Sequence, residues 1–265
     1  MNVAVVGLGL IGGSFEKASR RAGHVVAALH HGDETGFEKA DLVLVCLPPE
    51  AIVPWISRHA AQFKAGCVVV DIAGVKRTIQ SSFEKAFPTG TGRWTFVGGH
   101  PMAGREVSGY ANALATLFDG ASMILVPRDA KDFPERASLE AFFRSLGFSR
   151  VVVTTAERHD AMIAFTSQLC HVIATAYSRD ALVPETPGFS AGSYADMTRI
   201  ATQDAEIWSA LYLANAASLL PVLDRFMARL GDFRRALDEG DRDALCRIIS
   251  EGAAAKRNES CLSRI

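Results

Sequence analysis

The chain has 265 residues, of which 49% are hydrophobic and 22% charged, and its formal net charge is -1. This size is typical of a globular protein with one large or two modest domains. The balanced charge, without a run of like charges, predicts no nucleic-acid partner and no binding to an anionic membrane. The five cysteines form no CxxC pair and predict neither a disulfide framework nor a zinc site. The N-terminus lacks the pattern of a signal peptide or a membrane span, so we expect a cytoplasmic protein.

The first residues predict a strand, a glycine-rich turn and a helix. A β-branched run at 2–6 leads into the pattern GxGxxG and a helix through Arg21. Gly7 allows the tight turn, Gly9 lets the backbone approach a pyrophosphate, and Gly12 lets the helix pack closely on the strand. The pattern therefore predicts a dinucleotide site, against the alternative of a turn without a ligand.

The end of the second predicted strand, 25–29, departs from the usual dinucleotide pattern. An NAD site normally has Asp or Glu there, whereas this chain continues with His30, His31, Gly32, Asp33 and Glu34. The imidazoles could face the 2′-phosphate of NADP, or Asp33 could reach the ribose of NAD. Only about a dozen residues precede the next strand, too few for a full crossover helix, so the second helix is expected to be shortened or lost.

Further predicted strands end in residues suited to ligand binding. Leu47 and Pro48 follow the strand that begins near Leu42, and Asp71 to Lys76 follow the strand that begins at Val68. The carboxyl ends of parallel strands form the edge of the sheet where ligands of open α/β folds bind. We expect these residues at that edge.

The segment Gly98–Glu106 presents a histidine at another strand end. His100 follows two glycines and precedes a proline, so its backbone leaves the strand in a tight turn. An imidazole that titrates near neutral pH is a candidate acid or base. The alternative is a histidine that only caps a turn.

The pattern changes near residue 155. Strands and helices alternate before it, and only helices are predicted after it, which indicates an α/β Rossmann-like domain with a mostly parallel sheet at 1–155 and an all-α domain at 156–265. In the helix predicted for 157–178, one side is apolar and is expected to face the core: Met162, Phe165, Leu169, Val172, Ile173 and Ala176.

The opposite side of that helix carries small and polar residues, including Gln168 and His171, and no Lys or Glu. We therefore expect His171 to point into a pocket or an interface, against the alternative of ordinary helix packing. Arg199 offers a planar fork for a carboxylate, although a surface ion pair is the alternative. A long helix is expected from its N-cap Asp204 toward Arg229, with a bend at Pro221.

Several separated segments of the chain match one known family. They are GLGLIGGS at Gly7–Ser14, DxxxVK at Asp71–Lys76, GGHPMAGRE at Gly98–Glu106, HDAMIAFTSQLCH at His159–His171, and TRIATQDAEIW with Asn215. Together they resemble the prephenate and arogenate dehydrogenases of tyrosine biosynthesis. The HPMAG turn and the later His-Asp helix are the most specific of these segments.

The resemblance implies a fold, a reaction and partners. The fold is a dinucleotide-binding domain followed by a helical domain through which two chains pair as a homodimer. The reaction is oxidative decarboxylation: a cyclohexadiene dicarboxylate passes hydride to NAD or NADP, loses carbon dioxide and becomes aromatic. NAD is favoured, and no metal is expected because aromatisation supplies the driving force.

The resemblance also implies residue roles. His100 would take the hydroxyl proton, Arg199 would hold a substrate carboxylate, and His171 would be a second histidine of the pocket. The predicted cofactor site consists of Gly7, Gly9, Leu10, Ile11, Gly12, His30, Leu47, Pro48 and Asp71. The predicted substrate site adds Gly74, Lys76, Arg105, Glu106 and Gln168.

Position 74 departs from the family. Family members commonly have a serine there, whose hydroxyl supports the catalytic histidine, and this chain has Gly74. Losing one such hydrogen bond costs on the order of 1 kcal/mol, or about fivefold in rate. The departure leaves open a related substrate such as 4-amino-4-deoxyprephenate, or an inactive dinucleotide sensor. A β-hydroxyacid dehydrogenase would need a lysine in the helical domain, and 157–178 contains none.

Overall fold

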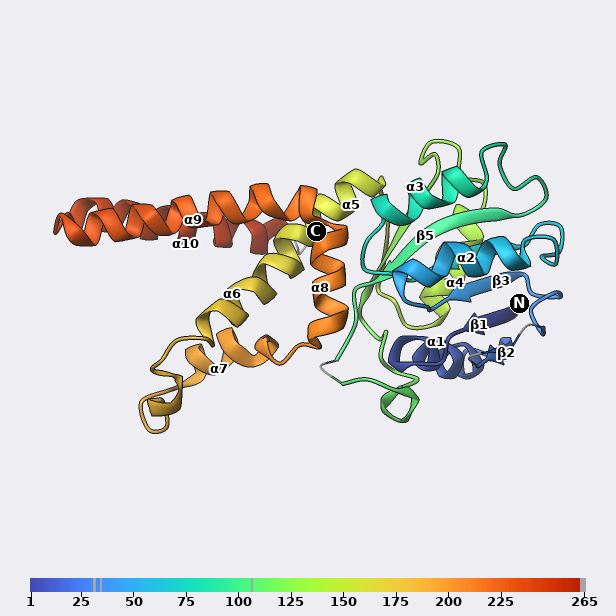
Figure 1. The fold of residues 1–265 in the computed structure, drawn as a ribbon, viewed down its shortest axis with the longest axis horizontal. Helices are drawn as coiled ribbons and strands as arrows, with labels where there is room; N and C mark the ends of the chain where they lie inside the picture. The colour runs from blue at the N-terminus through green and yellow to red at the C-terminus, as the bar shows by residue number, and fades with distance from the viewer. Residues whose placement is uncertain (31, 34, 106, 263–265) are drawn as a thin grey trace. The chain divides into compact units, whose positions relative to one another are not determined.

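The computed structural model describes residues 1–262 except 31, 34 and 106 (Figure 1). The chain divides into two compact units, Met1–Ala216 and Ala217–Ile265. The expected boundary between 155 and 156 stays a prediction. The site described below lies entirely within the first unit.

A seven-stranded sheet forms the centre of the first unit. Its strand order is β2-β1-β3-β4-β5-β6-β7, and only the pair β5–β6 is antiparallel. This arrangement confirms the predicted mostly parallel Rossmann-like sheet. The strands are β1 (Asn2–Val6), β2 (Val25–Leu29), β3 (Leu42–Val45), β4 (Val68–Asp71), β5 (Thr95–Pro101), β6 (Ser122–Pro127) and β7 (Arg150–Val153).

Helices cover both faces of the sheet because successive strand side chains point to opposite sides. In β1, Val3 and Val5 join the core on the face of α1 (Leu10–Arg21) and α4 (Arg136–Ser145). Ala4 and Val6 join the core on the face of α2 (Pro49–His59) and α3 (Arg77–Ala86). Figure 1 shows α2 and α3 next to each other, in agreement with their direct contact. The described residues between β2 and β3 form no helix, which confirms the shortened second crossover.

The parallel strands bring their carboxyl ends to one edge. Val6 pairs with Val45, Val45 with Asp71, and Asp71 with Gly98. The turn after β1, the Pro48 turn after β3 and His100 in β5 therefore lie along the same edge of the sheet.

Helices follow β7. The first unit contains α5 (Ala156–Ile163), a π-helical turn (Ala164–Gln168), α6 (Leu169–Tyr177), α7 (Gly192–Thr198) and α8 (Ala205–Ala214), with 3-10 turns at Tyr110–Asn112, Val183–Glu185 and Arg199–Ala201. The second unit consists of most of α9 (Ala216–Asp238) and of α10 (Arg242–Leu262). Among the described residues, no single helix has the length and apolar composition to cross a bilayer; α8 and α9 pass that test only when taken together.

The predicted apolar core face of the helix at 157–178 is wrong at Met162 and Phe165 and is confirmed at Leu169, which is 5% exposed. Met162 is 42% exposed and Phe165 58%, whereas His159, Asp160 and Ile163 are buried. Two features explain the difference. The helix contacts the start of α3 through Asp160, a polar residue that an apolar pattern does not reveal. Phe165 lies within the π-helical turn, where i to i+5 hydrogen bonds change the angular spacing of the side chains.

The predicted long helix is interrupted at Asn215. Pro221 lies within α9, and the bend expected there stays a prediction. The Asn215 side-chain amide donates to the Asp160 carbonyl (2.9 Å) and to Gln168 Oε1 (2.8 Å), which holds this residue out of helical geometry. The predicted N-cap is confirmed, since Asp204 accepts a hydrogen bond from the Ile207 amide (2.9 Å).

Candidate active site

A cavity of about 710 Å³ lies between the carboxyl edge of the sheet and the helices that follow β7. Five of the predicted site residues line it: Gly74, His100, Arg105, Gln168 and His171. They come from the loop after β4, from β5 and its following turn, from the π-helical turn and from α6. Residues separated by almost a hundred positions in the sequence therefore share one hollow.

A chain of hydrogen bonds leads away from His100 into the protein interior. His100 Nδ1 lies 2.9 Å from His159 Nε2, and His159 Nδ1 lies 2.7 Å from Asp160 Oδ1. His159 and Asp160 are each 1% exposed. Water therefore has little access to the inner part of this chain.

Asp160 is held in turn by the N-terminus of α3. Its Oδ1 accepts the Lys76 amide and its Oδ2 accepts the Arg77 amide, each at 2.9 Å. These are among the backbone donors that a helix leaves without an intrahelical acceptor, and the helix dipole favours a negative charge at this end. The carboxylate thus caps α3 from a distant part of the chain.

The hydrogen-bond chain determines the tautomer of His100. Both oxygens of Asp160 accept backbone N–H groups, so His159 Nδ1 must donate to Oδ1. A neutral imidazole carries one proton, so His159 Nε2 accepts from His100 Nδ1. The lone pair of His100 is consequently on Nε2, which lies 3.8 Å from the position that a Cβ of Gly74 would occupy.

The surroundings keep both imidazoles neutral. Burial, with added repulsion from His159 and Lys76, holds the pKa of His100 well below its usual value. Burial also lowers the pKa of His159, against the opposing effect of Asp160. At neutral pH, His100 therefore presents an unprotonated Nε2 to the cavity, as a general base requires.

His159 and Asp160 are the functional residues that our sequence reasoning missed. They open the segment HDAMIAFTSQLCH, which we used only to identify the family resemblance. A signal was available, because two adjacent ionisable residues begin a segment, 159–171, that otherwise consists mostly of apolar and small residues. Such a pair is rarely buried without partners.

His171 also lines the cavity. Its Nδ1 donates to the Ile200 carbonyl (3.1 Å), and its ring lies against Trp208 with centroids 3.7 Å apart. Gln168 also lines the cavity, but its amide donates to the Leu211 carbonyl (3.2 Å) and accepts from Asn215. Gln168 therefore fastens α8 to the π-helical turn.

Three predicted substrate residues lie elsewhere or are not described. Lys76 is 2% exposed, and its ammonium forms an ion pair with Asp71 outside the cavity walls. Arg199 is exposed and is not among the residues that line the cavity, although its neighbour Ile200 is. Glu106 lies outside the described residues. The cation that does line the cavity is Arg105.

The glycine turn at the start of α1 fits a dinucleotide phosphate. Gly7 has a φ of +88°, and a Cβ on Gly12 would lie 1.9 Å from the Gly7 carbonyl oxygen, so both positions require glycine. A Cβ on Gly9 would meet nothing within 4 Å, which leaves open space in front of the turn. No side chain caps the helix, and its first turn, with Leu10 and Ile11, carries no acidic residue. Its N–H groups are therefore available to an anion.

The other predicted cofactor residues surround this turn only in part. The Leu47 side chain lies beside Gly7, and Pro48 is the N-cap of α2. The His30 amide donates to Asp33 Oδ2 (2.7 Å), so the Asp33 carboxylate stays at the end of β2. The Asp71 carboxylate is buried and belongs to the ion pair with Lys76.

Among the described residues, no three His, Cys, Asp or Glu side chains come together in a group that could hold a metal ion.

Two family models cover most of the chain. Residues 8–153 match "Prephenate dehydrogenase, nucleotide-binding domain" and residues 155–251 match "Prephenate dehydrogenase, dimerization domain". The chain is 30% identical to a cyclohexadienyl dehydrogenase of Zymomonas mobilis, over 96% of the chain and 94% of that protein. It is 25% identical to a prephenate dehydrogenase of Bacillus subtilis, over 93% of the chain and 73% of that protein.

Solved structures share the fold. A Synechocystis arogenate dehydrogenase superposes with a TM-score of 0.82 at 22% identity, over 98% of this chain and 100% of that one. A prephenate dehydrogenase from A. aeolicus, crystallised with hydroxyphenyl propionate and NAD+, gives a TM-score of 0.78 at 24% identity, over 98% of both chains.

Proposed function

This chain belongs to the prephenate dehydrogenase family, and we propose that it oxidises and decarboxylates prephenate with NAD as the hydride acceptor. The observation that carries the proposal is the unprotonated Nε2 of His100, which the His159–Asp160 pair directs toward a cavity of about 710 Å³. A cavity of this size accommodates a single-ring substrate together with part of a cofactor.

His100 acts as the base in this proposal. Its Nε2 accepts the proton of the ring hydroxyl while hydride leaves the same carbon, and its Nδ1 keeps its hydrogen bond to His159. The His159–Asp160 pair stabilises the positive charge that develops on the imidazole. Loss of carbon dioxide then makes the ring aromatic, so His100 handles only the hydroxyl proton.

Two cations are proposed to hold the substrate carboxylates. Arg105 lines the cavity and is suited to pair with one of them. Arg199 remains the proposed partner of the second, since the adjacent Ile200 lines the same cavity. His171 and Trp208 pack together in the wall of the same cavity, where an aromatic product can lie against the indole.

The glycine turn is proposed to bind the pyrophosphate of the cofactor through Gly9 and the N–H groups of Leu10 and Ile11. When bound, NAD supplies the hydride-accepting nicotinamide. We favour NAD over NADP because the Asp33 carboxylate at the end of β2 would accept hydrogen bonds from ribose hydroxyls and repel a 2′-phosphate. Asp33→Ser should reduce kcat/KM with NAD and raise it with NADP, and an unchanged ratio would remove Asp33 from cofactor choice.

His100→Asn tests the base directly. The asparagine amide can still donate toward His159, whereas the atom that accepts the substrate proton is gone. We expect kcat with prephenate and NAD, followed as reduced nicotinamide absorbance, to fall by about 10² to 10⁴-fold while the Kd for NAD stays within about twofold. Unchanged turnover would contradict this mechanism.

Parallel assays decide between related functions. The purified protein is tested with prephenate and with arogenate, each with NAD and with NADP. No turnover in any combination, with NAD binding intact, would favour the sensor over the enzyme. We also propose that two chains pair through the residues that match the dimerization domain, which light scattering of the purified protein would test.

A further inference from the structure

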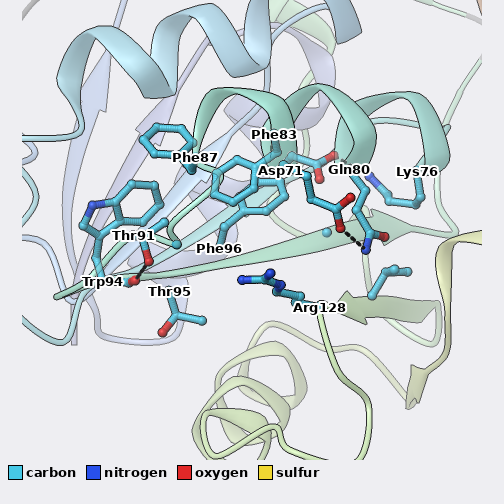
Figure 2. Close-up of a pocket in the computed structure, with 14 residues that line it drawn as sticks. Asp71, Lys76, Gln80, Phe83, Phe87, Thr91, Trp94, Thr95, Phe96 and Arg128 are labelled. Carbon is cyan, nitrogen blue, oxygen red and sulfur yellow. Dashed lines mark hydrogen bonds and ion pairs between the residues drawn. The ribbon is translucent and has the colours of Figure 1, made fainter.

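A second cavity of the first unit has no role in the function proposed above. It has a volume of about 130 Å³ and lies between α3, the loop after α3 and strands β5 and β6 (Figure 2). Four aromatic side chains line it, Phe83, Phe87, Trp94 and Phe96, and we call it the aromatic pocket. An engineered apolar cavity of about 150 Å³ holds one benzene molecule. The aromatic pocket is of comparable size, which matches it to a ligand with a single six-membered ring.

The aromatic rings already support one another. Phe83 stacks on Phe96 with centroids 4.1 Å apart, and Phe87 and Trp94 meet edge to face at 5.5 Å. Figure 2 shows the four rings grouped at one end of the cavity, with Asp71 and Arg128 beyond them. A ligand ring would enter a preformed apolar site, which lowers the cost of ordering on binding.

A buried oxygen in the pocket wall lacks a hydrogen bond. Asp71 is 0% exposed, and its Oδ1 accepts from the Lys76 ammonium and from the Ala73 amide (3.0 Å). Among the described residues, nothing donates to Asp71 Oδ2. A buried acceptor without a donor is uncommon and is satisfied when a ligand brings one. Because the Lys76 ammonium is close by, a neutral hydroxyl suits this position better than a second cation.

A cation lies at the exposed part of the wall. Arg128 follows β6, is exposed, and has no ion-pair partner within the described part of the chain. The nearby Glu84 carboxylate accepts from the Gln80 amide (3.2 Å) on its own helix. Arg128 is therefore available to pair with an anionic group that projects from the pocket.

We propose that the aromatic pocket binds a single-ring phenol that carries a carboxylate. The ring lies among the four aromatic side chains, the hydroxyl donates to Asp71 Oδ2, and the carboxylate meets Arg128. The reaction proposed above releases a compound of this class, so the pocket can sense product; that extension rests on the proposed function, whereas the binding itself does not.

Fluorine NMR of the full-length protein labelled with 5-fluorotryptophan tests the proposal. Trp94 reports the aromatic pocket and Trp208 the catalytic cavity, so one spectrum separates binding at the two places. The probe is 4-hydroxyphenylacetate. We expect a saturable shift of the Trp94 signal, about tenfold weaker binding of phenylacetate, which lacks the hydroxyl, and weaker binding of p-cresol, which lacks the carboxylate.

Arg128→Gln should weaken the binding of 4-hydroxyphenylacetate, measured at the Trp94 signal, about threefold and should leave the binding of p-cresol unchanged. Arg136→Gln on α4, an exposed arginine outside the pocket, is the matched control and should change neither. The proposal is overturned if the Trp94 signal does not shift with 4-hydroxyphenylacetate at millimolar concentrations. It is also overturned if the three probes bind equally well in the parent protein and in both variants. A Trp94 response in a protein without dehydrogenase activity would sink the proposed function and leave this site standing.

Discussion

Replacing Asp160 with asparagine tests whether the buried hydrogen-bond chain sets the proton position on His100. Asparagine offers one oxygen to three donors, the Lys76 amide, the Arg77 amide and His159 Nδ1. When that oxygen accepts from Arg77, its NH₂ group faces His159 Nδ1 and the Lys76 amide loses its acceptor. His159 would then carry its proton on Nε2 and donate to His100 Nδ1, which moves the His100 proton to Nε2. The base would present an N–H group to the substrate in place of a lone pair.

The size of the effect follows from what the base contributes. General base catalysis by a positioned side chain is worth about 10² to 10⁴-fold, which corresponds to about 3 to 5 kcal/mol of transition-state stabilisation. Water cannot easily restore the original tautomer, because His159 and Asp160 are each only 1% exposed. The weaker cap of α3 adds about 1 kcal/mol of lost folding stability, too little to unfold a typical domain.

The assay combines kinetics with nitrogen NMR of the histidine rings. We expect kcat to fall by about two to four orders of magnitude with the Kd for NAD unchanged, and the His100 and His159 signals to report exchanged tautomers. Asp241→Asn is the matched control, because Asp241 caps α10 through the Ala244 amide (2.9 Å) and touches no imidazole. A folded Asp160→Asn protein with kcat within about threefold of the parent would refute the reasoning.

Two further predictions follow from the same site. A Cβ at Gly74 would lie 3.7 Å from Leu211 and 3.8 Å from His100 Nε2, so a serine fits at this position. Gly74→Ser should raise kcat/KM for prephenate up to about fivefold, while Gly74→Ala, which lacks the hydroxyl, should not. Equal effects of the two substitutions in steady-state assays would refute a role for the hydroxyl. The pKa values of His100 and His159 are lowered in the folded protein, so below about pH 6.5 the unfolded chain binds protons at these two rings while the folded protein does not. The free energy of unfolding should therefore be at its full value above about pH 6.5. It should fall as the pH drops below that value, by up to about 1.4 kcal/mol per pH unit for each ring. Urea unfolding of the parent and of His159→Gln at pH 7.5 and 5.5 checks this, and an equal pH dependence in the two proteins would contradict it.

Local patterns in the sequence predicted the sheet and the glycine turn correctly. Strand alternation and the spacing of Gly7 and Gly12 depend on neighbours a few residues away, and such short-range geometry is readable from one sequence. The missing helix before β3 followed from length alone. These predictions needed no knowledge of tertiary contacts.

The site was harder to predict because its partners are distant in the chain. The role of His159 depends on His100, 59 positions earlier, and that of Asp160 on the amides of α3. Lys76 was predicted to bind substrate, but its side chain forms an ion pair with Asp71 instead. A charged residue after a strand can turn to either side of the sheet, and the sequence does not say which. Met162 and Phe165 were assigned to the wrong face because periodicity cannot reveal a polar contact surface or a π-helical turn.

The capping of α3 by Asp160 has a consequence for how the enzyme becomes active. His100 and α3 belong to the part that matches the nucleotide-binding domain, whereas Asp160 belongs to the part that matches the dimerization domain. A nascent chain that ends before residue 160 can build its sheet and glycine turn but holds an imidazole with an undirected proton. In the proposed mechanism, His100 therefore becomes a directed base only after α5 has formed its contacts with α3, and a chain truncated before α5 would lack that base.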